Sequence, residues 1–265
     1  IGGKQMNYDY MHKLLSLEGK NAIITGGSQG IGKGIAISLA QFGCAVTICG
    51  RNDKLLAETK TEIEAFGGQC ETSKFDISKE EEVERFFADY RKSHDKLDIY
   101  IGNAGYTIHK PALETTSDEI DGLYATNFKG TIFGVSRAAE MMKPRKCGNI
   151  VVITSVNALY PLPSQGVYTT TKCALEGLIR CIAADLSKYG IRVNTMAPGG
   201  INTNMNHDMF VDPELRAKFD PLVPLGHIGT IEEMGDVVAC MVSDAFRYMT
   251  GSTVLVDGGL MLRMQ

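Results

Sequence analysis

The chain has 265 residues, of which 44% are apolar, and its formal net charge is −4. This length suits one large α/β domain, and the apolar fraction is enough for a substantial core. No apolar run approaches the roughly 20 residues that span a bilayer, and we recognise no signal peptide. The weak negative charge offers no basic patch, so we expect neither a nucleic-acid partner nor a membrane partner.

Seven cysteines form an odd set, with no Cys-x-x-Cys pair and no His/Cys spacing suited to zinc. Most of them stand in apolar surroundings, so we interpret them as small core residues in a reducing compartment. We therefore predict a cytoplasmic protein without a metal site.

Short β-branched runs alternate with longer amphipathic segments after residue 16. The first fifteen residues carry no periodic pattern, and we treat residues 1–16 as an N-terminal extension. The pattern predicts strands at residues 21–25, 45–49, 70–76, 97–102, 149–155, 192–198 and 252–259. Helices are predicted between them, at residues 31–42, 53–66, 80–93 and 117–142, and in a segment that begins near Tyr168.

About seven strands separated by helices are typical of a parallel sheet that is covered on both faces. Right-handed crossovers then give a doubly wound, Rossmann-like α/β fold that binds ligands at the carboxyl ends of its strands. No linker or internal repeat interrupts the alternation, so residues 17–265 are predicted to form a single domain. The least regular stretch, residues 198–226, is expected to be a mobile segment over a pocket.

A glycine cluster, "TGGSQGIG", lies at the turn between the first strand and the following helix. Its residues Gly26, Gly30 and Gly32 let the backbone pass close to a pyrophosphate. The helix N-terminus supplies N–H groups and a positive dipole end. Glycines alone are weak evidence because turns use them anyway, but this position favours a dinucleotide site.

The end of the second strand should contact the adenosine ribose. The segment "CGRND" places Gly50 at the strand tip and Arg51 directly after it. An acidic residue there would accept a hydrogen bond from a free 2′-hydroxyl, whereas an arginine accommodates a 2′-phosphate. Asp53 instead falls in the first turn of the next helix, where an acid is favoured anyway. We predict NADP rather than NAD, although Arg51 could also be an exposed loop charge.

The segment "YTTTK" places Tyr168 and Lys172 four residues apart, on one face of a helix. Taken alone, the pair is better explained as an exposed amphipathic feature that solvates the helix, because this spacing occurs often by chance. Ser155, however, ends the fifth strand thirteen residues earlier, at the sheet edge where ligands bind. The strand end and the helix start can therefore converge on one small volume.

At this point the chain resembles the short-chain dehydrogenase/reductase family, over residues 17–259. The matching segments are, in order, "TGGSQGIG", "FDIS", "GNAG", "YATNFKG", "VVITS", "YTTTK", "VNTMAPG" and "TGSTVLVDGG". The resemblance implies that Tyr168 is the general acid/base, that Ser155 hydrogen-bonds the substrate oxygen, and that Lys172 grips the nicotinamide ribose. It implies that Asn127 is the fourth member, beside a water that links Lys172 to solvent.

The same resemblance implies a set of NADP-binding residues along the carboxyl edge of the sheet. These are Gly26, Ser28, Gln29, Gly30, Ile31, Gly32, Arg51, Asn52, Asp76, Ile77, Asn103, Ala104, Gly105, Tyr168, Lys172, Pro198, Gly199, Ile201 and Thr203. Two positions depart from the family pattern. Gly102 stands where a second Asn is frequent, and Gln29 stands where many NADP-preferring members carry a basic residue. The NADP prediction therefore depends on Arg51.

The expected chemistry is hydride transfer between NADP(H) and a secondary alcohol or ketone. A phenol with a reference pKa of about 10 is a poor base at neutral pH. We expect the Lys172 ammonium and a positive nicotinamide to lower the Tyr168 pKa toward the working pH. Ser155 would donate a hydrogen bond to the developing oxyanion.

The substrate pocket is expected from the loops that follow the fourth, fifth and sixth strands. Its candidate residues are Ser155, Asn157, Tyr160, Tyr168, Tyr106 and Met205, with Val156, His109 and His207 as further neighbours. The overall pattern resembles members that act on sugars, sugar acids and polyols, such as gluconate 5-dehydrogenase and sorbose reductase. Hydroxysteroid dehydrogenases and 3-oxoacyl-carrier-protein reductases are the alternatives.

An alternative of another class is a catalytically silent NADP(H)-binding sensor or scaffold. Such a protein would be expected to lack one of Ser155, Tyr168 and Lys172, and all three are present. By resemblance we also expect a homotetramer. We leave open whether residues 200–224 close over the ligand.

Overall fold

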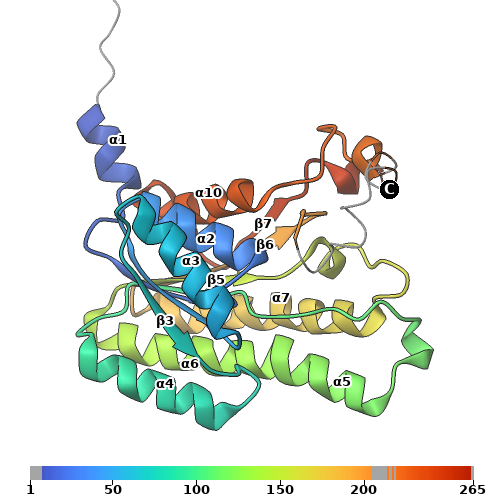
Figure 1. The fold of residues 1–265 in the computed structure, drawn as a ribbon, viewed down its shortest axis with the longest axis horizontal. Coiled ribbons are helices and arrows are strands. Elements are labelled where there is room, and N and C mark those ends of the chain that lie inside the picture. The colour runs from blue at the N-terminus through green and yellow to red at the C-terminus, as the bar shows by residue number, and fades with distance from the viewer. Residues whose placement is uncertain (1–7, 204–213, 215–216, 218, 264–265) are drawn as a thin grey trace, which may run out of the picture.

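A computed structural model describes residues 8–203, 214, 217 and 219–263. Its centre is one parallel sheet of seven strands in the order β3-β2-β1-β4-β5-β6-β7 (Figure 1). The strands are β1 Asn21–Thr25, β2 Ala45–Gly50, β3 Cys70–Lys74, β4 Ile99–Gly102, β5 Gly148–Ile153, β6 Ile191–Pro198 and β7 Thr253–Val256. The predicted doubly wound α/β fold is confirmed.

Helices cover both faces of the sheet (Figure 1). One face carries α2 (Gly30–Gln41), α3 (Asp53–Ala65) and α10 (Ile231–Val242), whose apolar residues join the first core cluster. The other face carries α4 (Glu80–Ser93), α6 (Thr131–Met142) and α7 (Gly166–Ser187), which join the second. Because both faces are covered, β1, β4 and β5 are almost continuously buried.

The segment predicted as one helix over residues 117–142 is divided into three parts. It begins as α5 (Ser117–Leu123), continues as the π-helical segment η2 (Tyr124–Gly130), and ends as α6. A π-helix is wider than an α-helix, and such segments are frequent at functional sites. Here the wide turn buries Asn127 completely.

The N-terminal extension is more regular than its sequence suggests. Residues Tyr8–Leu15 form helix α1, in which no residue is buried. It projects from the body of the protein in Figure 1, and the core begins at Leu17, which is 1% exposed. The absence of an apolar periodicity did not predict this helix.

Only part of the cysteine prediction is correct. Cys44, Cys49 and Cys70 are buried, whereas Cys147, Cys173 and Cys181 are exposed and Cys240 is intermediate. Within the described ranges, no helix is long and apolar enough to cross a membrane.

Short 3₁₀ segments connect several of these elements. They are η1 Ala112–Glu114, η3 Lys143–Arg145, η4 Val156–Ala158, η6 Asp220–Leu222, η7 Asp244–Phe246 and η8 Leu260–Arg263. The turns that follow β1 to β6 all lie at the carboxyl edge of the sheet, which is where a doubly wound fold binds ligands.

Candidate active site

A cavity of about 1080 Å³ opens along the carboxyl edge of the sheet. Every predicted cofactor residue except Gly32 lines it. Of the predicted substrate residues, Ser155, Asn157, Tyr168 and Tyr106 line the cavity, whereas Tyr160 does not. Met205 and His207 lie outside the described residues.

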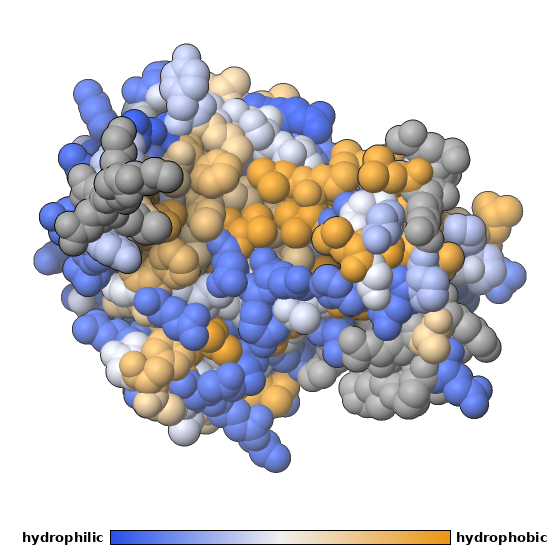
Figure 2. All heavy atoms as spheres, turned by 90° about the horizontal axis from the view of Figure 1, so that it is seen from above, coloured by the Kyte–Doolittle hydropathy of each residue, from blue (hydrophilic) through white to orange (hydrophobic). Residues whose placement is uncertain are grey.

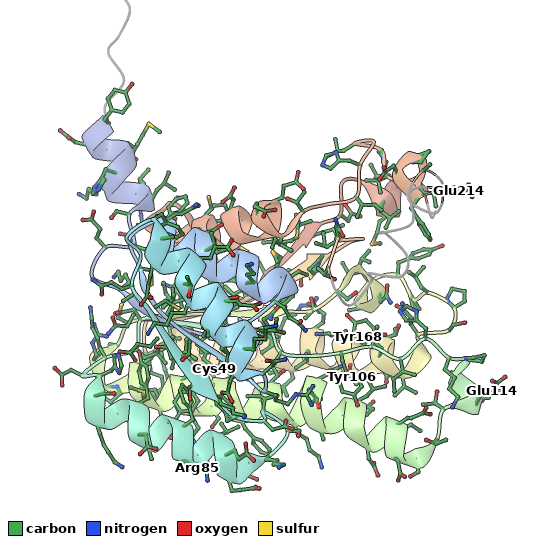
Figure 3. The ribbon with its side chains drawn as sticks, viewed as in Figure 1. Cys49, Arg85, Tyr106, Glu114, Tyr168 and Glu214 are labelled. Atoms are coloured by element: carbon green, nitrogen blue, oxygen red, sulfur yellow. The ribbon has the colours of Figure 1, made fainter. Side chains whose placement is uncertain are left out.

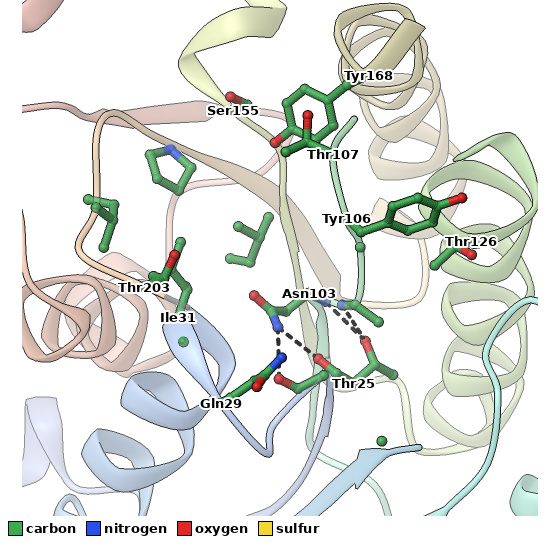
Figure 4. Close-up of a pocket in the computed structure, with 18 of the residues that line it drawn as sticks. Thr25, Gln29, Ile31, Asn103, Tyr106, Thr107, Thr126, Ser155, Tyr168 and Thr203 are labelled. Atoms are coloured by element: carbon green, nitrogen blue, oxygen red, sulfur yellow. Dashed lines mark hydrogen bonds between the residues drawn. The ribbon is translucent and has the colours of Figure 1, made fainter. Parts of the chain in front are cut away.

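Ser155 and Tyr168 lie beside each other in the cavity, as Figure 4 shows. Ser155 follows β5 and caps η4, where its hydroxyl oxygen accepts a hydrogen bond from the Asn157 backbone N–H at 3.1 Å. That bond leaves the hydroxyl proton of Ser155 available for another acceptor. Tyr168 comes from the first turn of α7 and is labelled there in Figure 3.

Lys172 lies one helical turn after Tyr168 and is 5% exposed. Its ammonium donates a hydrogen bond to the Ile153 carbonyl at 2.8 Å and stands 5.7 Å from the centre of the Tyr168 ring. The predicted spacing therefore does place the phenol and the ammonium at one site. Burial lowers the pKa of Lys172 to about 8, and the charge of Glu176 opposes that shift.

The pKa of Tyr168 differs from the prediction. Burial raises it, and a hydrogen bond with Ser155 only partly opposes that effect. Removing the phenol from water disfavours its charged form. In this geometry the protein's own groups do not lower the Tyr168 pKa in the way the sequence reasoning expected.

Asn127 lies behind the cavity wall rather than in it. Its side-chain oxygen accepts from the Tyr106 backbone N–H at 3.0 Å, and its amide donates to the Tyr106 carbonyl at 2.9 Å. A Cβ at Gly105 would lie 3.0 Å from the Asn127 oxygen and 3.7 Å from the Lys172 ammonium. Asn127 and Lys172 therefore flank this glycine, and Asn127 fixes the loop beside it.

The turn after β1 fits a dinucleotide phosphate. Gly26 and Gly30 have positive φ angles of 66° and 55°, and a Cβ at Gly32 would stand 2.2 Å from the Gly26 carbonyl oxygen. No side chain caps the start of α2, where the helix dipole favours an anion. Asn103 braces this turn by donating to the carbonyls of Thr25 and Gly26 at 3.0 and 3.2 Å (Figure 4).

The ends of β2 and β3 present cations to the cavity. Arg51 is mostly exposed and stands 3.8 Å from Asp76. Burial opposes ionisation of Asp76, but hydrogen bonds from Ser78 and the Arg51 charge outweigh burial and lower the pKa. Lys74, which sequence reasoning missed, pairs with Gly50 in the β2–β3 register, lines the cavity and contacts Asp53 at 2.5 Å.

The opposite end of the cavity carries amides and a hydroxyl. The Asn157 amide donates to Gln165, and Gln165 is 3.1 Å from Nδ1 of His109. The Thr107 hydroxyl is buried and has no hydrogen-bond partner among the described residues, and Figure 4 shows Thr107 beside Tyr168. His109 itself does not line the cavity. We call Asn157, Gln165 and Thr107 the amide end, and the turn at residues 26–32 with Arg51 the glycine end.

Sequence reasoning missed Thr107, Gln165 and the apolar residues of this region. Gln165 precedes α7 directly, so its distance of three residues from Tyr168 was the available signal. The missed apolar lining residues are Leu162, Phe219, Leu222 and Leu260.

A family model described as enoyl-(acyl carrier protein) reductase, of the short-chain dehydrogenase type, matches residues 26–261. The chain belongs to the short-chain dehydrogenase/reductase family. The description names one activity within the family, and the match establishes membership of an oxidoreductase family rather than that activity. The family predicted from the eight sequence segments is confirmed.

Relatives in this family act on different substrates. The chain is 34% identical to 3beta-hydroxysteroid dehydrogenase 1 of Eggerthella lenta, over 93% of this chain and 95% of the relative. It is 33% identical to gluconate 5-dehydrogenase of Gluconobacter oxydans, over 93% and 96%. The fold also matches the Pseudomonas aeruginosa RhlG/NADP active-site complex, with a TM-score of 0.89 and 29% identity over 94% and 99% of the two chains.

Proposed function

We propose that this short-chain dehydrogenase/reductase uses NADP(H) to interconvert a secondary alcohol and a ketone. The observation that carries the proposal is the convergence of Ser155, Tyr168 and Lys172 in the same cavity as the glycine turn. A binding sensor would need neither the buried ammonium nor the phenol beside an available hydroxyl. The catalytic function is therefore favoured over a silent sensor.

Each residue of the site has a separate role in the proposed reaction. Ser155 donates its hydroxyl proton to the substrate oxygen and holds that oxygen beside the phenol. Tyr168 delivers a proton to the oxygen during reduction and accepts it during oxidation. Lys172 stabilises the phenolate through its charge and orients the ribose hydroxyls, while Asn127 fixes the adjacent loop. The nicotinamide supplies or receives the hydride when the cofactor is bound.

NADP is favoured over NAD at the glycine end. Arg51 stands at the tip of β2 beside the cavity, and Lys74 adds a second cation on the neighbouring strand. A 2′-phosphate carries negative charge that both cations attract, and a guanidinium binds phosphate oxygens in a bidentate manner. The bound NADP of the Pseudomonas relative supports this choice.

A sugar, a sugar acid or a polyol is the favoured substrate class. Asn157, Gln165 and Thr107 offer hydrogen bonds to hydroxyl groups, and the Gluconobacter relative is a gluconate 5-dehydrogenase. An oxo-steroid is the second candidate, because apolar side chains also line this region and the Eggerthella relative is a hydroxysteroid dehydrogenase. A 3-oxoacyl thioester is the third.

The proposal includes a homotetramer in the cytoplasm. Figure 2 shows a continuous apolar area on the face seen from above. Large exposed apolar residues include Leu255 in the edge strand β7, Tyr248 and Leu262. Large exposed apolar patches are typical of interaction sites. Sedimentation should find a tetramer at micromolar concentration, and a monomer would contradict this assembly.

The cytoplasmic location rests on the cysteine pattern, which includes free thiols.

The direct test follows the absorbance of the reduced nicotinamide with NADPH and, separately, with NADH. The panel contains ketoses, keto sugar acids, oxo-steroids and a 3-oxoacyl thioester. We expect NADPH-dependent turnover of a sugar-derived ketone. Turnover with NADH alone would overturn the cofactor choice, and turnover of a steroid alone would overturn the substrate class. NADPH binding without turnover of any carbonyl would favour the sensor.

A further inference from the structure

A buried carboxylate lies next to the site, but the reaction outlined above does not use it. Glu176 is 5% exposed and lies one helical turn after Lys172 on α7, away from the cavity lining. Burying a carboxylate is costly unless charges or hydrogen bonds compensate it. A residue of this kind on the same helix as the proposed acid/base therefore requires an explanation.

Three threonine hydroxyls hold this carboxylate. Thr154 donates to one oxygen at 2.6 Å, and Thr195 and Thr253 donate to the other at 3.1 and 2.6 Å. The largely exposed Arg180 stands 3.4 Å from that second oxygen. These hydrogen bonds compensate the cost of burying the carboxylate.

The three donors come from three neighbouring strands. Thr154 follows β5 and directly precedes Ser155, while Thr195 lies in β6 and Thr253 in the edge strand β7. One side chain of α7 therefore fastens the helix to the part of the sheet that presents Ser155. Since Tyr168 and Lys172 lie on the same helix, these bonds set the phenol and the serine hydroxyl relative to each other.

The negative charge of Glu176 has a second consequence, for Lys172. The groups around that ammonium are the Tyr168 phenol on its own helix, the Ile153 carbonyl from β5, and Gly105 and Asn127 on the far side. None of these carries a negative charge while the phenol is protonated. Among the described residues, Glu176 is the one whose charge raises the Lys172 pKa against burial.

We propose that Glu176 is a positioning residue of this reaction, which fixes α7 against the strand end at Ser155 and stabilises the Lys172 ammonium by its charge. This inference rests on the proposed oxidoreductase function. It assigns no contact between Glu176 and the substrate or the cofactor.

The test compares Glu176→Gln with the wild type in the pH profile of carbonyl reduction. The alkaline limb reports proton loss from the coupled Tyr168–Lys172 pair. Removing a nearby negative charge destabilises the protonated form of both groups. The limb should therefore move to lower pH, by about one unit. Glu176→Asp keeps the charge and should leave the limb within a few tenths of a unit of its original position.

An unmoved limb in a folded Glu176→Gln variant would overturn the charge role. Thr154→Val tests the positioning role separately, because it keeps the carboxylate and removes its bond to the strand end. We expect kcat to fall about tenfold with an unmoved limb, and Thr154→Ser to restore it, since small misplacements of reacting groups are costly. An unchanged kcat in Thr154→Val would overturn the positioning role even if Glu176→Gln fails to fold.

Tyr168→Phe, measured in parallel, distinguishes a failure of the proposed function from a failure of the proposal for Glu176. Full activity in that variant would refute the proposed function itself. Loss of activity in Tyr168→Phe, combined with a wild-type profile in Glu176→Gln, would refute only the inference about Glu176.

Discussion

The glycine end and the amide end of the cavity are constructed in different ways. At the glycine end, the shape comes from backbone: positive φ angles at Gly26 and Gly30, and a helix N-terminus without a side-chain cap. At the amide end, the surface consists of side chains from loops, such as Asn157 and Gln165. The first arrangement accommodates a group common to all dinucleotides, whereas the second can change its ligand by exchanging single residues.

The relatives likewise share a family but differ in the substrates that their names give. A steroid dehydrogenase and a gluconate dehydrogenase are about equally similar to this chain. Substitutions at the glycine end should therefore affect every reaction of the enzyme. Substitutions at the amide end should change only the preference among substrates.

The largest effect is expected between the two ends, at Tyr168. Tyr168→Phe removes the proton donor and should lower kcat by about 10²- to 10⁴-fold. NADPH affinity should stay close to that of the wild type, because the phosphate turn is untouched. Steady-state kinetics and a fluorescence titration of NADPH measure the two quantities. Tyr106→Phe, which also changes a tyrosine of the cavity, is the matched control and should retain kcat within a few-fold.

A single added methyl group should displace the backbone of the glycine end. In Gly32→Ala, the new Cβ would stand 2.2 Å from the Gly26 carbonyl oxygen and 2.4 Å from the Asn103 amide. The turn must then move, and cofactor affinity should fall at least tenfold, together with a lower Tm. The matched control is Gly177→Ala, an exposed helical position with nothing within 4 Å of its Cβ. That variant should gain about 0.5–1 kcal/mol of stability. A normal NADPH affinity in Gly32→Ala would contradict the rigid turn.

Arg51 tests which dinucleotide the glycine end prefers. Arg51→Ala removes a hydrogen-bonded charge, worth about 1.5–3 kcal/mol, so the Kd for NADPH should rise about 10- to 100-fold. The Kd for NADH should change little, since that cofactor lacks the 2′-phosphate. Arg85→Ala changes a cation outside this cavity and is the control. Equal weakening of both cofactors by Arg51→Ala would refute the 2′-phosphate contact.

The smallest effect is expected at the amide end. Gln165→Leu removes the bridge between Asn157 and His109. It should raise KM for a sugar-derived ketone about 2- to 10-fold, the value of one neutral hydrogen bond, and leave KM for NADPH unchanged. Comparing the two KM values in one variant gives an internal control. A higher KM for NADPH would show that the two ends are coupled.

The sequence predicted the glycine end more completely than the amide end. Parallel strands and short turns place residues such as Asn103 and Arg51 at one sheet edge, whatever the details of packing. The spacing of Tyr168 and Lys172 was predictable for the same reason, because a regular helix fixes it. These positions follow from the regular spacing of residues along a helix or strand, which can be counted in the sequence.

Other features depend on three-dimensional packing and were not predictable in this way. We expected Lys172 and the nicotinamide together to lower the Tyr168 pKa, but in the protein alone burial of the phenol raises it. Tyr160 was expected in the cavity and lies outside its lining, because loop conformation rather than periodicity directs that side chain. Lys74 was not predicted because its position beside Gly50 depends on the register between β2 and β3. That register cannot be deduced from the sequence.

The π-helical segment from Tyr124 to Gly130 makes the site depend on the exact number of residues in this part of the chain. Each residue of a helix turns the chain by about 100°, so deleting one residue here would rotate every side chain that follows relative to those before it. Asn127 and the buried face of α6 could not then both remain in place. A point substitution at Asn127 changes one side chain, whereas a one-residue deletion would separate the loop at Tyr106 from the sheet-packing helix.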